Sequence, residues 1–408
     1  MDNTSPSAQT QTSSSTGAVN FVFLVIYMAG LSAFGSFVND MYLPSLPSMM
    51  KFFNCSISTV QLGLTMGMAG LGVGEIILGP ISDKYGRKPL LIATLLAFTV
   101  ASVVSVYSRD IRFFLICRFF QGVGGSGGYF LARAIPADLY SGRTLAKTMA
   151  IIGAINGIAP ASSPVLGGLI STHYSWKGVF WALAGFSVLL LCFSWKFKES
   201  LAIDKRTKGN LFSSYKNYIV LLRNGKFMTH VLLKGSALGV LYAYISSGPF
   251  IFEDHFGFSQ TDFGLIMGAN ALLVAAGSII ALKFRELKQA AFVGGIGLCI
   301  IVIIISIVLF LKPDHFLYYE LLLLPMLFCL GIAFTVGNTL SMDEGRSMAG
   351  DASAVLGIVG YIFGAVVSPL VGKGNIMYST AIAYLIIMVV VVVSAFITRK
   401  LAVDNDGL

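Results

Sequence analysis

Long apolar runs separated by short polar loops constrain the fold of this sequence more than any other feature. Twelve runs are long enough to cross a bilayer, which takes about 20 apolar residues in a helix. We expect the spans at residues 18–44, 57–80, 89–107, 111–133, 146–171, 176–197, 227–250, 260–283, 289–311, 317–341, 350–372 and 376–399. Because 56% of the 408 residues are hydrophobic and only 12% are charged, a soluble fold could not cover its surface with polar groups. The sequence therefore predicts an all-α membrane protein with twelve transmembrane helices.

A polar segment near the middle of the chain divides the runs into two sets of six. We interpret residues 198–226 as a cytoplasmic linker between an N-terminal bundle (18–197) and a C-terminal bundle (227–399). Residues 1–17 are mostly Ser, Thr, Gln and Asn, so we expect a disordered tail, because such a segment cannot bury a core. Residues 400–408 form a short C-terminal tail.

A faint internal repeat supports two equivalent bundles. The sequence SPVLG at 163–167, in the fifth run, matches SPLVG at 368–372, in the eleventh run, at an offset of 205. The fifth and eleventh runs hold equivalent positions if two six-helix halves repeat in parallel.

The basic residues indicate how the chain is oriented. If both termini are cytoplasmic, the inside loops and ends carry twenty Lys and Arg residues and the outside loops carry six. Short inside loops are enriched in Lys and Arg, so this count predicts cytoplasmic termini and a cytoplasmic linker. The bases that give the net charge of +9 collect in loops on one side of the membrane. We therefore expect a lipid bilayer as partner and no nucleic acid.

The loop between the second and third runs carries an ordered set of glycines and charges. Gly79, Asp83, Gly86, Arg87 and Lys88 follow the order G-x-x-x-D-x-x-G-R-K. Gly86 suits a turn with positive φ, and the Asp83 carboxylate can pair with a base or lie at a helix N-terminus. An ordinary basic loop would explain the charges but not their order.

Charged side chains inside membrane spans are costly and often functional. Asp40 ends the first run beside two prolines that break the helix and admit water, so it is either a carboxylate wetted by the outer interface or a proton site facing a central cavity. Arg118, three residues before Gln121, stays charged and needs a carboxylate or carbonyl groups from another helix, unless it snorkels to the outer surface.

Two further charged residues lie within the runs. Glu75 is in the middle of the second run among glycines, where a proton role and a structural hydrogen bond are equally consistent with its position. Lys234, near the start of the seventh run, fits a snorkelling lysine better than a cavity base.

The fifth run is rich in glycine and proline. Gly157, Pro160, Pro164, Gly167 and Gly168 follow the spacing G-x-x-P-x-x-x-P-x-x-G-G. Small residues let helices approach closely and prolines bend them, but this spacing is more specific than packing alone requires.

Together these motifs resemble those of the Bcr/CflA group, the bicyclomycin and chloramphenicol resistance transporters of the major facilitator superfamily. The matching segments are the Asp40–Pro47 stretch DMYLPSLP, the Gly79–Lys88 loop, Arg118-x-x-Gln121-Gly122, the fifth-run motif, YISSGPFIF at 244–252 and ASAVLG at 352–357.

The resemblance implies the major facilitator fold, with two six-helix bundles around a central cavity, in a bacterial inner membrane. It implies alternating access and drug export driven by proton uptake, with Asp40 in the proton role, Arg118 in the coupling role and the Gly79–Lys88 loop as a conformational switch. The group usually has an uncharged residue at the position of Glu75, so Glu75 is a third candidate and the proton count is left open. We further expect Asp83 to dock near Asp351, at the cytoplasmic start of the eleventh run, in the outward-facing state.

We therefore expect a monomeric, proton-coupled exporter of small amphipathic compounds, with no catalytic residues, metal or cofactor. The residues expected to line the substrate cavity are Asn39, Tyr42, Gln121, Asn156, Tyr242, Tyr244 and Asn270. The same fold could instead carry a sugar or another metabolite, in either direction. A membrane-embedded enzyme or receptor is disfavoured, because the sequence has no evident metal cluster or Ser/His/Asp set.

Overall fold

The computed structural model describes residues 21–206 and 215–403, so the predicted tail at 1–17 lies outside the described residues. The described chain is almost entirely helical. The N-terminal half contains α1 (Phe21–Asp40), α3 (Ile57–Tyr85), α4 (Arg87–Val106), α5 (Ile111–Leu139) and α6 (Gly142–Ser194). The C-terminal half contains α8 (Gly225–Pro249), α9 (Gln260–Ala281), α10 (Leu287–Phe310), α11 (Phe316–Glu344), α12 (Ala349–Val371) and α13 (Ile376–Val403). Shorter elements are η1 (Leu43–Ser45), α2 (Leu46–Phe53), η2 (Ile203–Lys205), α7 (Tyr215–Arg223), η4 (Phe250–His255) and η5 (Arg346–Met348).

The helices confirm the predicted fold class. Ten segments of the described chain are long and apolar enough to cross a membrane. One of them, α6, covers two of the predicted spans. A kink at Ser175, which has a non-helical φ of 59° and ψ of 179°, divides these two spans. The twelfth span is α5, whose five glycines and three arginines lower its hydropathy. The fifth and sixth spans thus follow each other at a sharp kink without an intervening loop.

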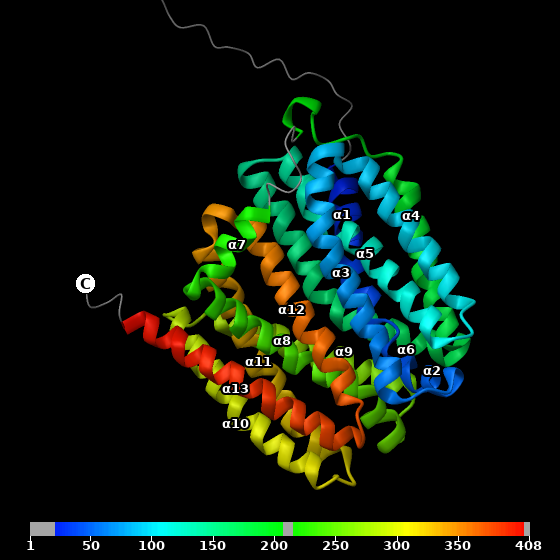
Figure 1. The fold of residues 1–408 in the computed structure, drawn as a ribbon, viewed down its shortest axis with the longest axis vertical. Helices are drawn as coiled ribbons and strands as arrows, with labels where there is room; N and C mark the ends of the chain where they lie inside the picture. The colour runs from blue at the N-terminus through cyan, green and yellow to red at the C-terminus, as the bar shows by residue number, and fades with distance from the viewer. Residues whose placement is uncertain (1–20, 207–214, 404–408) are drawn as a thin grey trace, which may run out of the picture.

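The two halves form two helix bundles that meet along one side and diverge toward the other, as Figure 1 shows. In the N-terminal half, α5 packs against α3, α4 and α1, and in the C-terminal half α8 packs against α11, α12 and α13. The halves touch mainly through two helix pairs, α6 with α9 and α12 with α3.

The ends of the bundles differ in their loops. One end carries η1, α2 and η4, and we call it the closed end. The opposite end carries the α3–α4 turn at Gly86, which has the predicted positive φ of 105°, and we call it the loop end. The helix α7, within the segment predicted as a linker, packs against α8 and α12.

Candidate functional site: a central cavity between two bundles

A cavity of about 580 Å³ lies between the two halves. Its wall comes from α1, α5 and α6 on one side and from α8, α9, α11 and α12 on the other. Its polar lining comprises Ser36, Asn39, Asp40, Tyr129, Asn156, Tyr242, Tyr244, Asn270, Ser278 and Tyr361. The remaining lining is mostly aliphatic, so the cavity suits a compound with an apolar body and a few polar groups.

Backbone contacts between α6 and α9 seal the closed end. A Cβ atom at Gly264 would lie 2.5 Å from the Pro164 carbonyl oxygen, and one at Gly168 would lie 2.4 Å from the Gln260 carbonyl oxygen. Only glycine allows the main chains to approach this closely. The predicted fifth-run motif thus lies at the interface of the two halves.

The helices α3 and α12 make the equivalent contact on the other side of the cavity. Ser58 donates a hydrogen bond to the Pro369 carbonyl oxygen at 2.8 Å, and Thr65 donates one to the Ala365 carbonyl oxygen at 2.9 Å. At the periphery, Lys51 and Asp254 form an ion pair between the halves at 3.6 Å. The two copies of the internal repeat therefore both lie at the closed end.

Toward the loop end the two halves separate. A Cβ atom at Gly153 or Gly157 of α6 would meet no other atom within 4 Å, in contrast to Gly168 in the same helix. A second pocket of about 330 Å³ lies beyond the central cavity, between α3 and α5 of one half and α7 and α12 of the other. The cavity is thus sealed at the closed end and approached from the loop end.

Asp40 is placed on the cavity wall at the last residue of α1. Its residue is only 9% exposed, and its carboxylate has no hydrogen bond or ion pair with the described residues. The chain leaves α1 through η1 and α2, each of which begins with a proline in its first turn. The predicted helix break next to Asp40 is therefore present, and it positions a carboxylate without a partner against the cavity.

Arg118 lies behind this wall and does not pair with Asp40. It is fully buried in α5 and donates hydrogen bonds to the carbonyl oxygens of Val38 at 2.9 Å and Gly63 at 3.2 Å, and also to the Gln121 side chain. Its guanidinium stacks on the Tyr42 ring, 4.3 Å from the centroid. Carbonyl groups thus satisfy this cation, as the sequence allowed, and the bond to Val38 fixes the end of α1.

The predicted cavity residues divide into two groups. Five line the cavity: Asn39, Asn156, Tyr242, Tyr244 and Asn270. Tyr42 and Gln121 are instead fully buried beside Arg118, where the Gln121 amide donates a hydrogen bond to Ser102 at 2.7 Å. Tyr129 and Tyr361 also line the cavity and were not singled out from the sequence, although a tyrosine within an apolar run is a usable signal.

Glu75 lies where α3 crosses α12, between the central cavity and the second pocket. It is 8% exposed, and its Oε2 atom packs against Gly357, where a Cβ atom would lie 2.5 Å away. Its electrostatic neighbours are Arg133 from α5, Lys234 from α8 and the Tyr361 hydroxyl from α12. The span predicted to end at residue 133 continues as α5 to Leu139, so Arg133 lies within the helix.

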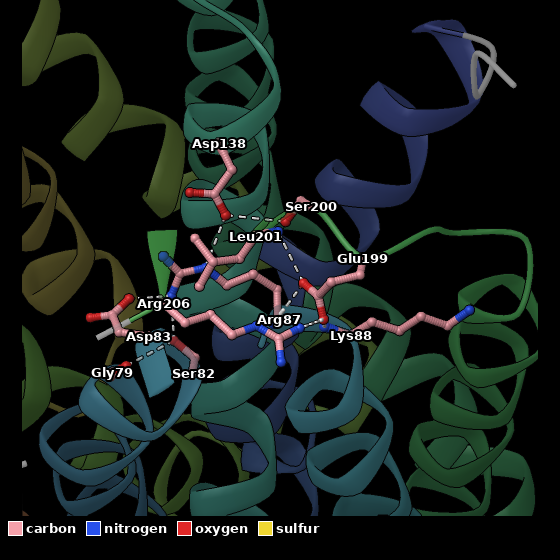
Figure 2. Close-up of polar contacts among 10 residues, drawn as sticks. All are labelled: Gly79, Ser82, Asp83, Arg87, Lys88, Asp138, Glu199, Ser200, Leu201 and Arg206. Atoms are coloured by element: carbon pink, nitrogen blue, oxygen red, sulfur yellow. Dashed lines mark hydrogen bonds and ion pairs between the residues drawn. The ribbon is translucent and has the colours of Figure 1, made fainter. Parts of the chain in front are cut away.

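The Gly79–Lys88 loop is held by a polar network on the N-terminal half (Figure 2). Arg87 pairs with Asp83 and, at 2.9 Å, with Asp138 at the end of α5. Asp83 also lines the second pocket together with Asp351 of α12. The two carboxylates thus face one pocket across the halves.

The chain after the sixth span joins this network. Glu199 accepts hydrogen bonds from the backbone N–H groups of Arg87 at 2.9 Å and Lys88 at 3.2 Å, the first two residues of α4. Arg206 lies 3.7 Å from the same carboxylate, and Ser200 donates a hydrogen bond to Asp138 at 3.1 Å. Figure 2 shows Glu199 beside Arg87 and Lys88 at the start of α4.

Two bundles of membrane-spanning helices around a central cavity define a membrane transporter rather than an enzyme. The family model for the Major Facilitator Superfamily matches residues 28–369, and the chain belongs to this superfamily.

Relatives support this assignment. The chain is 34% identical over 374 residues to the "Uncharacterized MFS-type transporter YdgK" of Bacillus subtilis, covering 88% of this chain and 92% of that one. It is 26% identical over 367 residues to the "Bicyclomycin resistance protein homolog" of Haemophilus influenzae, covering 86% and 89%. The motif resemblance to the bicyclomycin resistance group is thereby confirmed. Among solved structures, the partially occluded inward-open xylose transporter XylE of Escherichia coli matches with a TM-score of 0.71 at 14% identity, covering 94% of this chain and 99% of that one, which shows a shared fold.

Proposed function

We propose that this transporter is a proton-coupled antiporter that exports small amphipathic compounds across the bacterial inner membrane by alternating access. The observation that carries the proposal is Asp40, a carboxylate with no partner among the described residues, on the wall of a cavity that is approached from the loop end. An uncompensated carboxylate in such a place favours the neutral, protonated form, and water or a bound cation favours the ionised form. A proton and a substrate can therefore compete for this group.

The distribution of bases supports an orientation with the loop end in the cytoplasm. In that orientation the cavity is open to the cytoplasm and sealed on the outside, so the state is inward-facing. A compound enters from the inner leaflet or the cytoplasm and displaces the Asp40 proton. The outward-facing state would follow when α6 and α9 separate at the closed end and α3 and α12 approach at the loop end.

Arg118 takes a positioning role in this scheme. Its hydrogen bond to the Val38 carbonyl oxygen holds the last turn of α1, two residues from Asp40. A movement of α5 is thus passed to the Asp40 carboxylate through the backbone. We propose that the protein acts as a monomer, because one chain supplies both bundles and the whole cavity.

Transport in everted membrane vesicles tests the proposal. Wild-type vesicles should accumulate ethidium or chloramphenicol when the vesicle interior is made acidic relative to the outside. A protonophore should abolish this accumulation. Asp40→Asn should lose it. Wild-type vesicles that transport no compound of the panel, or transport it without regard to the gradient, would overturn the proposal.

A sugar or another metabolite is the second candidate substrate. Three asparagines and four tyrosines on the cavity wall could also hold hydroxyl groups. Uptake of a labelled pentose or hexose in the same vesicles, competed by unlabelled sugar and insensitive to the drug panel, would favour this candidate.

A further inference from the structure

We propose that Glu75 belongs to the same proton path as Asp40, and that the hydroxyl groups of Tyr242, Tyr129 and Tyr361 join the two carboxylates. This inference rests on the proposed proton-coupled function and extends it from one acid to a relay between two. The relay runs along the central cavity and ends at the second pocket.

The first link is Tyr242 of α8. It lines the same cavity as Asp40, and the Asp40 carboxylate is one of its electrostatic neighbours. Tyr242 also interacts with Tyr129 of α5, on the opposite half. Tyr242 therefore shares the cavity wall with the acid at the end of α1 and with Tyr129 and Tyr361.

The second link is Tyr361 of α12. Its electrostatic neighbours include Tyr242, Tyr129 and Glu75. Its hydroxyl lies beside the Glu75 carboxylate, which in turn lines the second pocket. A hydroxyl group both donates and accepts a hydrogen bond, so a chain of tyrosines, with water between them, can pass a proton along.

The charges around the two acids give the relay a direction. Two cations, Arg133 and Lys234, are electrostatic neighbours of Glu75, and Arg133 lines the second pocket with it. No cation of the described residues pairs with Asp40. Asp40 is therefore suited to hold the proton, and Glu75 is suited to release it.

Each step conserves protons and charge. The O–H bond of protonated Asp40 breaks and its proton passes to a hydroxyl oxygen, which gives its own proton to the next. The last hydroxyl protonates the Glu75 carboxylate, so Asp40 becomes the anion and every tyrosine ends neutral. Glu75 then releases the proton to water in the second pocket, which also contains Asp83 and Asp351.

A purely structural role for Glu75 makes a different prediction. A structural acid contributes stability through its contacts with α12 and the two bases, and it would keep one protonation state through the cycle. The relay requires that Glu75 changes its protonation state and that this change depends on the intervening hydroxyl groups.

Infrared titration of the full-length protein in proteoliposomes tests this without any substrate. The carboxyl band that disappears in Glu75→Gln should titrate across the working pH range of the wild-type protein. The band that disappears in Asp40→Asn should respond more slowly to a pH jump in Tyr361→Phe, because the proton of Asp40 passes through the tyrosines. A Glu75 band that stays constant at every pH would overturn the relay.

Transport of ethidium or chloramphenicol in the same proteoliposomes provides the second measurement. The ratio of proton-driven transport to substrate counterflow should fall about tenfold or more in Tyr361→Phe and Glu75→Gln, because a positioned proton-transfer group is lost. Tyr27→Phe removes a buried hydroxyl of α1 that does not line the cavity and should keep the wild-type ratio.

A wild-type ratio in both test variants would overturn the relay while leaving the proposed antiport intact. Wild-type protein that shows no proton-driven transport would instead overturn the antiport, and the infrared titration would still decide whether Glu75 exchanges protons.

Discussion

The Glu199 carboxylate accepts a hydrogen bond from the Arg87 backbone N–H at 2.9 Å, although 112 positions separate the two residues. The contact joins the segment after the sixth span to the first residue of α4, where a carboxylate is favoured by the helix dipole. The contact therefore anchors one end of the connecting segment. That end is held against the N-terminal bundle.

Glu199→Gln should lower the free energy of unfolding by about 1 kcal/mol, because a neutral amide interacts more weakly with a helix N-terminus and with Arg206. Thermal unfolding in detergent measures this change. Glu286→Gln is the matched control, since Glu286 precedes α10 without capping it through its side chain. Equal effects of the two substitutions would show that the Glu199 contact does not stabilise the fold.

Arg118→Lys should abolish proton-driven transport and lower the stability of the protein. A lysine cannot reach the Val38 and Gly63 carbonyl oxygens and the Gln121 side chain together, and each buried group left without a partner costs about 1–3 kcal/mol. Vesicle transport and the melting temperature are the two measurements. Arg112→Lys, on the exposed start of α5, is the control. A fully active Arg118→Lys protein would contradict the positioning role.

Gly264→Ala should shift the population away from the state described here. The new methyl group would lie 2.5 Å from the Pro164 carbonyl oxygen and force α9 away from α6 at the closed end. Distances between spin labels on the two halves measure the shift. Gly153→Ala in α6 is the control, because its methyl group has open space. If Gly264→Ala leaves the distances unchanged, the glycine contact is not what seals this end.

Asp83→Asn should favour the inward-facing state. Removal of the charge would weaken docking on the N-terminus of α12 in the outward-facing state, a contribution of about 0.3–2 kcal/mol. The ratio of the two populations, read from spin-label distances, should change accordingly. Asp343→Asn alters an exposed loop-end acid and should not change the ratio. An Asp83→Asn distance distribution identical to that of the wild type would argue against the docking model.

Cysteine labelling tests the orientation. Cys55 lies between α2 and α3 at the closed end, and burial raises the pKa of its thiol. Because the thiolate reacts, an impermeant maleimide should label Cys55 from outside intact cells, slowly at neutral pH and faster as the pH rises. A cysteine introduced by Ser213→Cys should react only after the membrane is opened. Labelling of both sites in intact cells would reject the topology.

The sequence was sufficient to predict the helices and much of the cavity. Runs of apolar residues determine the spans, the positive φ at Gly86 follows from its place in a tight turn, and Asp40 stood out as an acid beside two prolines.

The partners of the buried charges could not be predicted, because they depend on which helices pack together. Arg118 could have met a carboxylate or carbonyl groups, and only the packing of α5 against α1 and α3 selects the carbonyls of Val38 and Gly63. Tyr129 and Tyr361 belong to different halves, and their common position on the cavity wall is a tertiary property.

The main-chain seal between α6 and α9 has a pharmacological consequence. In the proposed orientation, a blocker added outside the cell would meet packed backbone rather than a path to Asp40, whereas a compound in the cytoplasm would reach the cavity directly. Block from the outside would therefore build up only while the transporter turns over, and its onset would depend on how often the protein is used. Idle protein would be protected from such a drug.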